Sequence, residues 1–421
     1  MTLKKWIASV IAFLLVLFPI VGCTQQKGGD GNSYFVQFQI DHQTFYIDGQ
    51  KISFQAYEEL LDEAGSIVQN IESALSVEIE SSDVSKVNNA KAGQSVGVRK
   101  ETAELLQLCK NYFEITGGKF TPALYPLTKL WKFSPENAGF YQQSRPEPSE
   151  SEILNALLVS DFSEYEIEGN FVKKPYSDSM LDFGGVAKGY MVDCILDRLN
   201  ELYSGREMDA VISVMSNMAL VGQSRASGEP RGYNIGITNP RALIPADNGI
   251  YNDPALYMVG LSDMSVTTSA DNYRFYVNGG KIYSHIIDSQ TGKPADTGII
   301  SVTVCVPLSV KNSGAFADAL STSGFCMNLR DSLSFFERMH KQYGVGAVII
   351  TSDFKYYSIG LNVMSAKEFA RYSNANYGTD FDETKYAEVF ERGSIEDAPE
   401  TVEACEKELQ YIDRCEEILN G

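Results

Sequence analysis

The sequence predicts an α+β fold, in which helices and strands mix without the strict alternation of a parallel α/β sheet. Two apolar patterns carry this prediction: residues 56–76 have a helical period, whereas residues 34–55 alternate apolar and polar side chains as strands do. The region 233–303 is rich in strand patterns. The chain has 421 residues, 44% of them hydrophobic, which is enough for one large domain or two smaller ones with a proper core.

The elements of the first half follow from these periods. The apolar stripe of 56–76 predicts an amphipathic helix, and a second helix is expected at about 100–116. A short helix at 151–160 follows a polar loop. Strands are expected near 164–182, and a glycine-containing loop then leads into a helix that ends at about residue 203.

The second half continues the mixture of elements. Residues 209–222 predict a buried strand pair around a turn, and alternating aromatic and polar residues predict a hairpin that turns at Asn278-Gly279. Helices are expected at 313–327 and 331–343. Strands are expected to follow at 346–351 and 354–360.

The N-terminus has the form of a bacterial lipoprotein signal. Lys4 and Lys5 precede an apolar run, from Trp6 to Val21, that is short for a membrane span. The run ends in Val-Gly-Cys, which predicts cleavage of residues 1–22 and attachment of lipid to Cys23. Residues 23–33 are then a flexible tether. The alternative is an uncleaved anchor with an incidental cysteine.

Charge and cysteine spacing limit the possible partners. The formal net charge is -20, and it becomes -22 when residues 1–22 and their two lysines are removed. Such a surface repels nucleic acid, so any phosphate binding has to be local. The six remaining cysteines lack paired C-x-x-C spacing, so no zinc site is indicated.

The C-terminal part is strongly acidic. From Asp380 onward the chain has fourteen acids and four bases, a net charge of -10. Residues 364–421 are therefore interpreted as an acidic extension, expected to be helical, beyond a domain that spans 34–363. Val402, Cys405, Leu409, Ile412 and Leu419 would form its apolar stripe. The alternatives are a helix docked on a surface and a mobile appendage.

The segment "LDFGGVAKGY", residues 181–190, carries the first candidate for chemistry. Gly184 and Gly185 stand between a predicted strand and a helix that begins at Ala187. Unpaired amides of a first helical turn bind phosphate, glycine lets the phosphate approach, and Lys188 adds a positive charge. The alternative is an ordinary strand–turn–helix connection, because the motif is neither a Walker loop nor G-x-G-x-x-G.

Three further segments offer polar groups of the right kind. Asp318 and Thr322 are four residues apart on one helical face, and a carboxylate with a hydroxyl suits Mg²⁺; a capped and packed helix start is the alternative. His285 and Asp288 stand where a strand enters a turn, and His285 is either a base or a hydrogen-bonded core residue. The hydroxyl-rich loop 265–274, with Arg274, either contacts ribose or phosphate or caps a strand.

Taken together and in this order, these motifs resemble those of the FAD:protein FMN transferase (ApbE) family. The likeness runs from about residue 55 to 361, through "ALSVEIESSDVSKVN", "TGGKFTPALYPLTKLWKF", "LDFGGVAKGYMVD", "HIIDSQTGKP" and "ADALSTSGF". The resemblance implies a mixed α/β fold with the FAD cleft between sheet-containing lobes. It also implies transfer of FMN from FAD to a Thr or Ser hydroxyl of an extracytoplasmic target protein, with release of AMP.

The resemblance also implies roles for individual residues. The implied Mg²⁺ ligands are the carbonyl of Ala187 and the side chains of Asp318 and Thr322. His285 is the implied base, and Lys188 and Asp182 complete the catalytic set. The FAD-binding residues are expected to be Gly184, Gly185, Lys188, Asn217, Thr268, Ser269, His285 and Asp288.

The sequence departs from the family pattern in ways that keep other functions open. Met215 and Ser216 stand where glycines are usual, Ala270 replaces a glycine, and Thr121 replaces an aspartate. Glu78 stands where transferases often have an aromatic residue. The alternatives are therefore an Mg²⁺-dependent FAD pyrophosphatase, a flavin-binding lipoprotein without chemistry, and an inert lipoprotein on a degenerate enzyme fold.

Overall fold

The computed structural model describes residues 36–420 except 141–142, 227, 243–253 and 387. The predicted signal peptide (1–22), the lipidation site Cys23 and the tether (23–33) lie outside the described residues. Among the helices that are described, none is long and apolar enough to cross a membrane. All six cysteines in the described part are free thiols.

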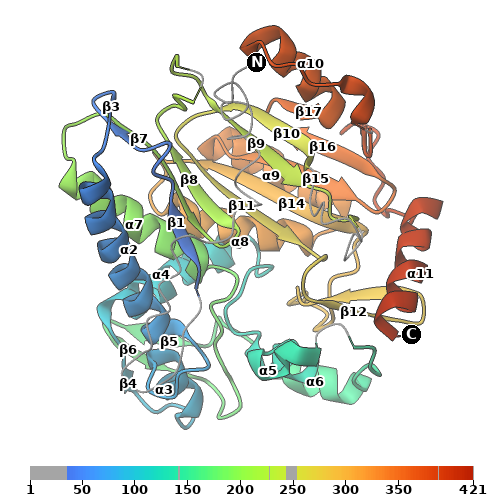
Figure 1. The fold of residues 1–421 in the computed structure, drawn as a ribbon. Coiled ribbons are helices and arrows are strands. Elements are labelled where there is room, and N and C mark those ends of the chain that lie inside the picture. The colour runs from blue at the N-terminus through green and yellow to red at the C-terminus, as the bar shows by residue number, and fades with distance from the viewer. Residues whose placement is uncertain (1–35, 141–142, 227, 243–253, 387, 421) are drawn as a thin grey trace.

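A large mixed sheet forms the centre of the molecule (Figure 1). Its strands follow the order β18-β16-β15-β14-β11-β8-β7-β2-β3, and β1 also pairs with β7. All pairs are antiparallel except β16 with β18. The bounds are β1 Phe38–Ile40, β2 Tyr46–Ile47, β3 Gln50–Lys51, β7 Met208–Val214, β8 Asn217–Val221, β11 Met264–Ala270, β14 Ile299–Pro307, β15 Gly346–Thr351, β16 Lys355–Ile359 and β18 Glu391–Arg392.

Helices cover one face of this sheet and bury the main hydrophobic core against it. In α2 the buried residues recur every three or four positions, as the apolar stripe predicts, and the side chain of Ser53 caps its first turn. Because β14 is packed on both faces, its residues up to Val306 are all buried. The helices are α2 Phe54–Leu75, α4 Lys100–Ile115, α7 Ala187–Leu202, α8 Ser313–Phe325 and α9 Leu329–Tyr343.

A small antiparallel sheet, in the order β17-β10-β9, packs on the opposite face of the large sheet. Helix α10 lies beside it, where Tyr257 of β10 stacks on Phe369 of α10 with ring centroids 3.9 Å apart. The mixture of three layers is the predicted α+β class. The bounds are β9 Tyr233–Thr238, β10 Pro254–Leu261, β17 Val363–Ser365 and α10 Ala366–Tyr377.

Two smaller units flank the helical side. The three-stranded sheet β4-β6-β5 lies near α3, and the hairpin of β12 and β13 packs on α5 and α6. Their bounds are α3 Asp83–Asn89, β4 Val96–Gly97, α5 Tyr125–Leu130, α6 Glu150–Leu158, β5 Glu166–Glu168, β6 Phe171–Lys173, β12 Phe275–Asn278 and β13 Lys281–Ser284; 3₁₀ turns span Pro135–Phe140 and Glu383–Lys385.

The strand predicted up to residue 182 is wrong beyond Lys173, because residues 174–183 form no strand. Hydrogen bonds from side chains fix this segment, where a strand would have backbone hydrogen bonds to a neighbouring strand. The ammonium of buried Lys174 donates to the carbonyls of Asn88, Ser177 and Ser179. Asn88 in turn exchanges two hydrogen bonds with the backbone of Leu181, at 2.7 and 2.9 Å. The segment before the glycines is thus a pinned loop.

The hairpin turn lies one residue later than predicted. Asn278 pairs with Lys281, so Gly279 and Gly280 are the two turn residues. Both have positive φ angles, +60° and +73°. A two-residue hairpin turn of this kind favours glycine at both central positions, which explains the shift from Asn278-Gly279.

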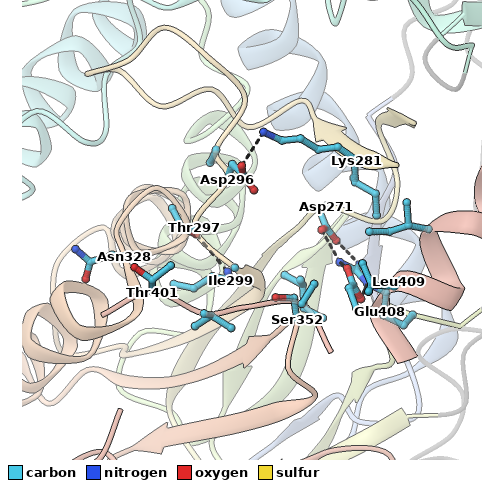
Figure 2. A pocket seen from close by; sticks show the side chains of 18 of the residues that line it. Asp271, Lys281, Asp296, Thr297, Ile299, Asn328, Ser352, Thr401, Glu408 and Leu409 are labelled. Atoms are coloured by element: carbon cyan, nitrogen blue, oxygen red, sulfur yellow. Dashed lines mark hydrogen bonds and ion pairs between the residues drawn. The ribbon is translucent and has the colours of Figure 1, made fainter. Parts of the chain in front are cut away.

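The acidic extension ends in α11, Glu406–Asn420, which packs on the β12–β13 hairpin. The predicted stripe is wrong for Leu409, which is 50% exposed. The buried face instead consists of Glu408, Tyr411, Ile412 and Cys415. In the structure the extension thus ends in a helix that is docked on the hairpin. A cavity of about 430 Å³ lies between the extension, the hairpin and the start of β14 (Figure 2).

Candidate functional site

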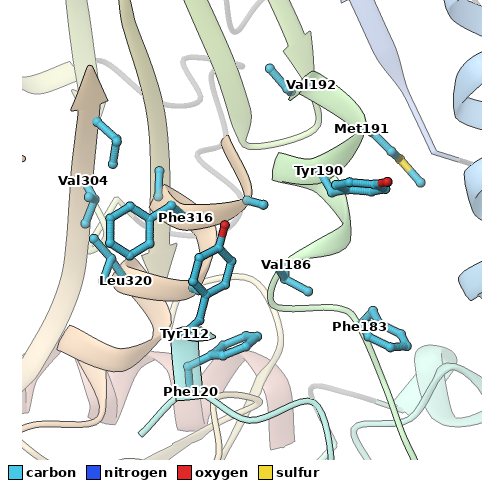
Figure 3. Packing of buried hydrophobic residues seen from close by; sticks show 14 of the residues in the cluster. Tyr112, Phe120, Phe183, Val186, Tyr190, Met191, Val192, Val304, Phe316 and Leu320 are labelled. Carbon is cyan, nitrogen blue, oxygen red and sulfur yellow. The ribbon is translucent and has the colours of Figure 1, made fainter. Parts of the chain in front are cut away.

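The glycine loop stands on an apolar base. Phe183 and Val186 are buried in the cluster around Tyr112, Phe120 and Phe316 (Figure 3). Gly184 between them is exposed. The apolar neighbours therefore hold the loop to the core, while its glycine backbone faces outward.

Asp182 shapes the beginning of this loop. Its Oδ1 atom accepts a hydrogen bond from the amide of Gly184 at 2.9 Å, and its own amide donates to the carbonyl of Pro122 at 2.7 Å. Burial raises the pKa of Asp182, whereas the Gly184 amide and the charges of Arg274 and Lys188 lower it. Asp182 thus acts on the loop backbone.

Helices α7 and α8 meet backbone to backbone just beyond the loop. A Cβ atom on Gly189 would lie 2.1 Å from the carbonyl oxygen of Gly314, so a larger residue does not fit. One turn later, Asp193 accepts hydrogen bonds from the amides of Gly314 and Ala315, both at 2.8 Å. A carboxylate from one helix therefore caps the other, which fixes how the two helices cross.

This crossing brings Asp318 of α8 to the start of α7. Its carboxylate is 96% removed from solvent, and Oδ2 lies 3.3 Å from the amide of Gly189 and 3.5 Å from the Lys188 ammonium. Burial raises the pKa of Asp318, while Lys188, the Gly189 amide and Asn217 lower it. Both contacts are longer than charge-assisted hydrogen bonds usually are, so the carboxylate keeps oxygen lone pairs for another partner.

Thr322 follows one turn after Asp318, beside the glycine loop. Its hydroxyl lies 3.2 Å from the Asp318 carbonyl oxygen and 3.4 Å from the hydroxyl of Ser269. A Cβ atom on Gly185 would lie 3.5 Å from Thr322 Oγ1 and 3.7 Å from the ring of Phe120. The bare backbone of Gly185 thus leaves space next to the Thr322 hydroxyl.

Lys188 bridges the loop and α8. Its ammonium donates to the Gly184 carbonyl at 2.5 Å and pairs with Asp318 at 3.5 Å. One positive charge therefore lies between the exposed glycine backbone and the buried carboxylate. An anionic ligand at this loop would meet that charge.

The end of β11 supplies hydroxyl groups to the same region. Ser269 bonds to Ser321 of α8 at 2.8 Å, and Thr268 bonds to Thr303 on the neighbouring strand at 2.9 Å. Ser269 is thus next to Thr322, whereas the Thr268 hydroxyl is engaged within the sheet.

Asn217 opens β8 and is fully buried. Its Oδ1 atom accepts a hydrogen bond from Thr267 at 2.5 Å, but its Nδ2 atom has no partner within the described ranges. The amide is close enough to Asp318 to lower the pKa of that carboxyl. The Asn217 amide therefore stands beside the Asp318 carboxylate and stabilises its charged form.

His285 stands at the open end of the β12–β13 hairpin. Its amide donates to the carbonyl of Arg274 at 2.9 Å, and its Nδ1 atom lies 3.2 Å from the same oxygen. Because a carbonyl can only accept, this contact requires the proton on Nδ1 and leaves Nε2 as a proton acceptor. Burial, with the charges of Arg274 and Lys188, lowers the pKa of His285 to about 3, so the ring is neutral at pH 7.

Asp288 forms an ion pair beside the turn that follows His285. Its carboxylate pairs with the Lys119 ammonium at 3.1 and 3.2 Å and accepts the Gln290 amide at 2.9 Å. The side chains of this ion pair are 15% and 13% exposed. Asp288 therefore ties residues 116–120 to the turn after His285, and its role as an FAD contact stays a prediction.

The residues around Asp318 have the chemistry of a magnesium site. They offer one carboxylate, hydroxyls and backbone carbonyls, all hard oxygen donors. Among the described residues, no group of three or more His, Cys, Asp and Glu side chains could hold a metal ion. Mg²⁺ is typically held by one or two carboxylates together with substrate phosphates, so this donor set fits it, and the space beside Gly185 leaves room for such oxygens.

Several residues that build the site were not predicted from the sequence. Gly189 and Gly314 set the helix crossing, and Asp193 caps α8. The available signal was the presence of a glycine within each of two helical patterns. A glycine inside a helix costs about 1 kcal/mol relative to alanine, so its presence indicates close packing at that position. Glu78, in contrast, lies on an exposed turn between α2 and α3.

Comparisons with known proteins show the family and the fold of the chain. The model of the ApbE family matches residues 43–349. The FAD:protein FMN transferase of Treponema pallidum is 30% identical over 306 residues, covering 70% of this chain and 77% of that protein. The FAD:protein FMN transferase of Vibrio cholerae is 24% identical, covering 85% of this chain and 97% of that protein.

Solved structures show the same fold. The ApbE protein of Thermotoga maritima superposes with a TM-score of 0.60 at 25% identity, covering 80% of this chain and 98% of that one. The apo form of the Pseudomonas stutzeri flavinyl transferase ApbE gives a TM-score of 0.59 at 23% identity, covering 82% and 99%. The family match ends at residue 349, before the acidic extension.

Proposed function

Because the chain belongs to the ApbE family, we propose that it is an FAD:protein FMN transferase that joins FMN from FAD to a Thr or Ser hydroxyl of a target protein. The proposal rests on one observation, which is that the glycine loop 184–188 lies next to Asp318 of α8. Gly184 exposes its backbone, Lys188 reaches from that backbone to Asp318, and Gly185 leaves space beside Thr322. A diphosphate ligand would use the charge of Lys188 and the open space beside Gly185.

The reaction is a phosphoryl transfer. The acceptor hydroxyl oxygen bonds to the phosphorus on the FMN side, and the bond from that phosphorus to the bridging oxygen of the diphosphate breaks. AMP leaves with the bridging oxygen. Neutral His285, with its free Nε2 atom, accepts the proton of the hydroxyl, while Lys188 stabilises negative charge on the phosphate oxygens.

We propose that Mg²⁺ is held by the carboxylate of Asp318, the hydroxyl of Thr322 and the backbone carbonyl of Ala187. When bound there, the ion would neutralise charge on the diphosphate and stabilise the leaving group. Asn217 and Ser269 border the same place from the large sheet, and their polar groups would position the ligand.

We also propose that the protein works outside the cytoplasm, attached to the membrane by lipid on Cys23. The support is the sequence alone: two lysines, a short apolar run and a small residue before the cysteine. Metabolic labelling with a radioactive fatty acid should mark the wild-type chain and leave the Cys23→Ala variant unmarked. Equal labelling of both would contradict the anchor.

The activity is tested with the chain from residue 24 onward, FAD, MgCl₂ and a candidate extracytoplasmic flavoprotein. Transfer gives target fluorescence that survives denaturation, together with one AMP per flavin bound. Free FMN and AMP without labelled target would show the pyrophosphatase instead. Unaltered FAD would reject both enzymatic functions and leave either flavin binding without chemistry or an inert protein.

A further inference from the structure

The hairpin that carries His285 at its base is held between two elements. Tyr276 and Tyr283, on one face, pack with Trp131 and Phe133 near α5. On the other face, Phe275 and Val277 pack on α11, together with the partly buried Ile282. Phe275 and Val277 are 1% and 0% exposed, so the C-terminal extension covers one face of the hairpin.

A buried charge network ties the same extension to the large sheet. The guanidinium of Arg241, which follows β9, bonds to both oxygens of Asp271 at 2.6 and 2.8 Å. It also bonds to both oxygens of Glu408 in α11 at 2.6 and 2.7 Å. All three side chains are at least 91% buried, and the network forms one wall of the cavity in Figure 2.

This network ends next to the candidate site. Asp271 is the first residue after β11, two positions after Ser269, which contacts Thr322. Three residues later, the carbonyl of Arg274 accepts from both the amide and Nδ1 of His285. The short connection 271–274 therefore joins the anchored Asp271 to the carbonyl that orients the histidine ring.

We propose that Glu408 of the C-terminal extension is a positioning residue, which acts through Arg241 and Asp271 to hold the Arg274 carbonyl that orients His285. The inference rests on the proposed function, because it assigns a catalytic purpose to the orientation of His285. It gives the acidic extension, which lies outside the family match, a role in the reaction.

Charge explains why Glu408 in particular has this role. A buried guanidinium that faces two carboxylates in two-pronged pairs has its position defined on both sides. Without Glu408, the Arg241 side chain loses two of its five hydrogen bonds and keeps those to Asp271 and to the Pro240 carbonyl. The side chain of Asp271 is then held by a guanidinium that is itself fixed on one side fewer. Burial raises the pKa of Glu408, and the hydrogen bonds and charge of Arg241 lower it.

The test compares Glu408→Ala with Glu417→Ala, which removes an exposed carboxylate from the same helix. Amide hydrogen exchange of the whole chain should become faster in peptides from residues 271–286 of the Glu408 variant, and stay unchanged in β14. At a temperature where both variants are folded, AMP release with the flavoprotein target should show at least a tenfold lower kcat for Glu408→Ala, with the Kd for FAD within twofold. Glu417→Ala should match the wild type.

Two further variants separate a positioning role of Glu408 from a general loss of stability. In a His285→Ala background, Glu408→Ala should not lower the residual rate again, whereas a general loss of stability would lower it in both backgrounds. If Glu408→Ala does not fold, Glu408→Gln keeps the shape and one acceptor, and about a threefold fall in kcat is expected. A kcat within twofold of wild type, or unchanged exchange in 271–286, overturns the inference. If the wild-type chain releases no AMP from FAD, the proposed function is wrong. The hydrogen-exchange measurement then still tests whether Glu408 holds residues 271–286 in place.

Discussion

Gly189 and Gly314 face each other where α7 crosses α8, so closely that a Cβ atom on Gly189 would lie 2.1 Å from the Gly314 carbonyl oxygen. Lys188 and Asp318 come together because of this contact, although they are far apart in sequence. The candidate site thus depends on two residues without side chains.

Gly189→Ala is expected to push the two helices apart. Overpacking of this kind costs roughly 1–3 kcal/mol, and contact with backbone atoms leaves little room to relax. Urea unfolding should show a lower midpoint, and FAD binding should weaken because Lys188 moves away from Asp318. Gly65→Ala in α2 is the matched control, since its Cβ would lie 3.5 Å from Phe38 and alanine favours a helix. Equal stability of the two variants would contradict the close crossing.

Gly185→Val should prevent FAD binding while the fold remains. The side chain would fill the space next to Thr322 and Phe120, and Gly185 has no positive φ that would make the substitution strained. Calorimetry should detect no FAD binding, and circular dichroism should match the wild type. Gly97→Val, on the exposed strand β4, is the control and should bind FAD normally. FAD affinity retained in Gly185→Val would remove the loop from the binding site.

Asp318→Asn should abolish the dependence of turnover on Mg²⁺. The amide keeps the shape of the carboxylate but loses its charge, so we expect AMP release to fall by at least about a hundredfold. Rates measured across an MgCl₂ titration check this, with Glu337→Gln on the exposed side of α9 as the control. A normal magnesium response in Asp318→Asn would place the metal elsewhere.

The rate should show no inflection from His285 between pH 5 and pH 8. Its pKa is lowered to about 3, so the ring is already neutral throughout this range and able to accept a proton. His285→Gln should lower kcat by roughly 10²–10⁴, as expected for loss of a general base. A pH profile of kcat with a rise centred near 6.5 would contradict the lowered pKa of the His285 ring.

The lowered pKa of His285 also predicts that the stability of the protein depends on pH. A histidine in the unfolded chain has a pKa of about 6.5, so between that value and about pH 3 the unfolded chain binds a proton that the native chain does not. Lowering the pH from 6.5 to 4 should therefore reduce the free energy of unfolding. His285→Gln should lose less stability over this interval than the wild type, which urea unfolding at both pH values will measure.

Local periodicity predicted the long helices well. The bounds of α2, α4, α7, α8 and α9 lie within two residues of the predicted segments. In α2 and α9 the buried residues form one apolar face, whereas α8 is buried on nearly all sides. The seven-residue α3 was not predicted, since it is short and mostly polar and is held by its Ser82 cap and by tertiary contacts. Tertiary contacts also fix residues 174–183, which were predicted as a strand. Hydrogen bonds from the side chains of Lys174 and Asn88 replace the backbone hydrogen bonds of a sheet there.

The candidate site was predictable in its parts but not in its assembly. The spacing of Asp318 and Thr322 and the two glycines of the loop are local features of the sequence. The pairing of His285 with the Arg274 carbonyl depends on a hairpin register, and the bonds of Arg241 to Glu408 span 167 residues. The buried face of α11 was misjudged because it includes the charged Glu408, whose partner cannot be seen in the local sequence.

The loop before the glycines has a consequence for binding kinetics. Lys174 and Asn88 fix its backbone through bonds to main-chain carbonyls and amides, without any help from a ligand. A preorganised backbone loses little conformational entropy when an anion arrives. FAD should therefore associate in a single rapid phase, and breaking the Lys174 contacts should slow that association before it affects the bound complex.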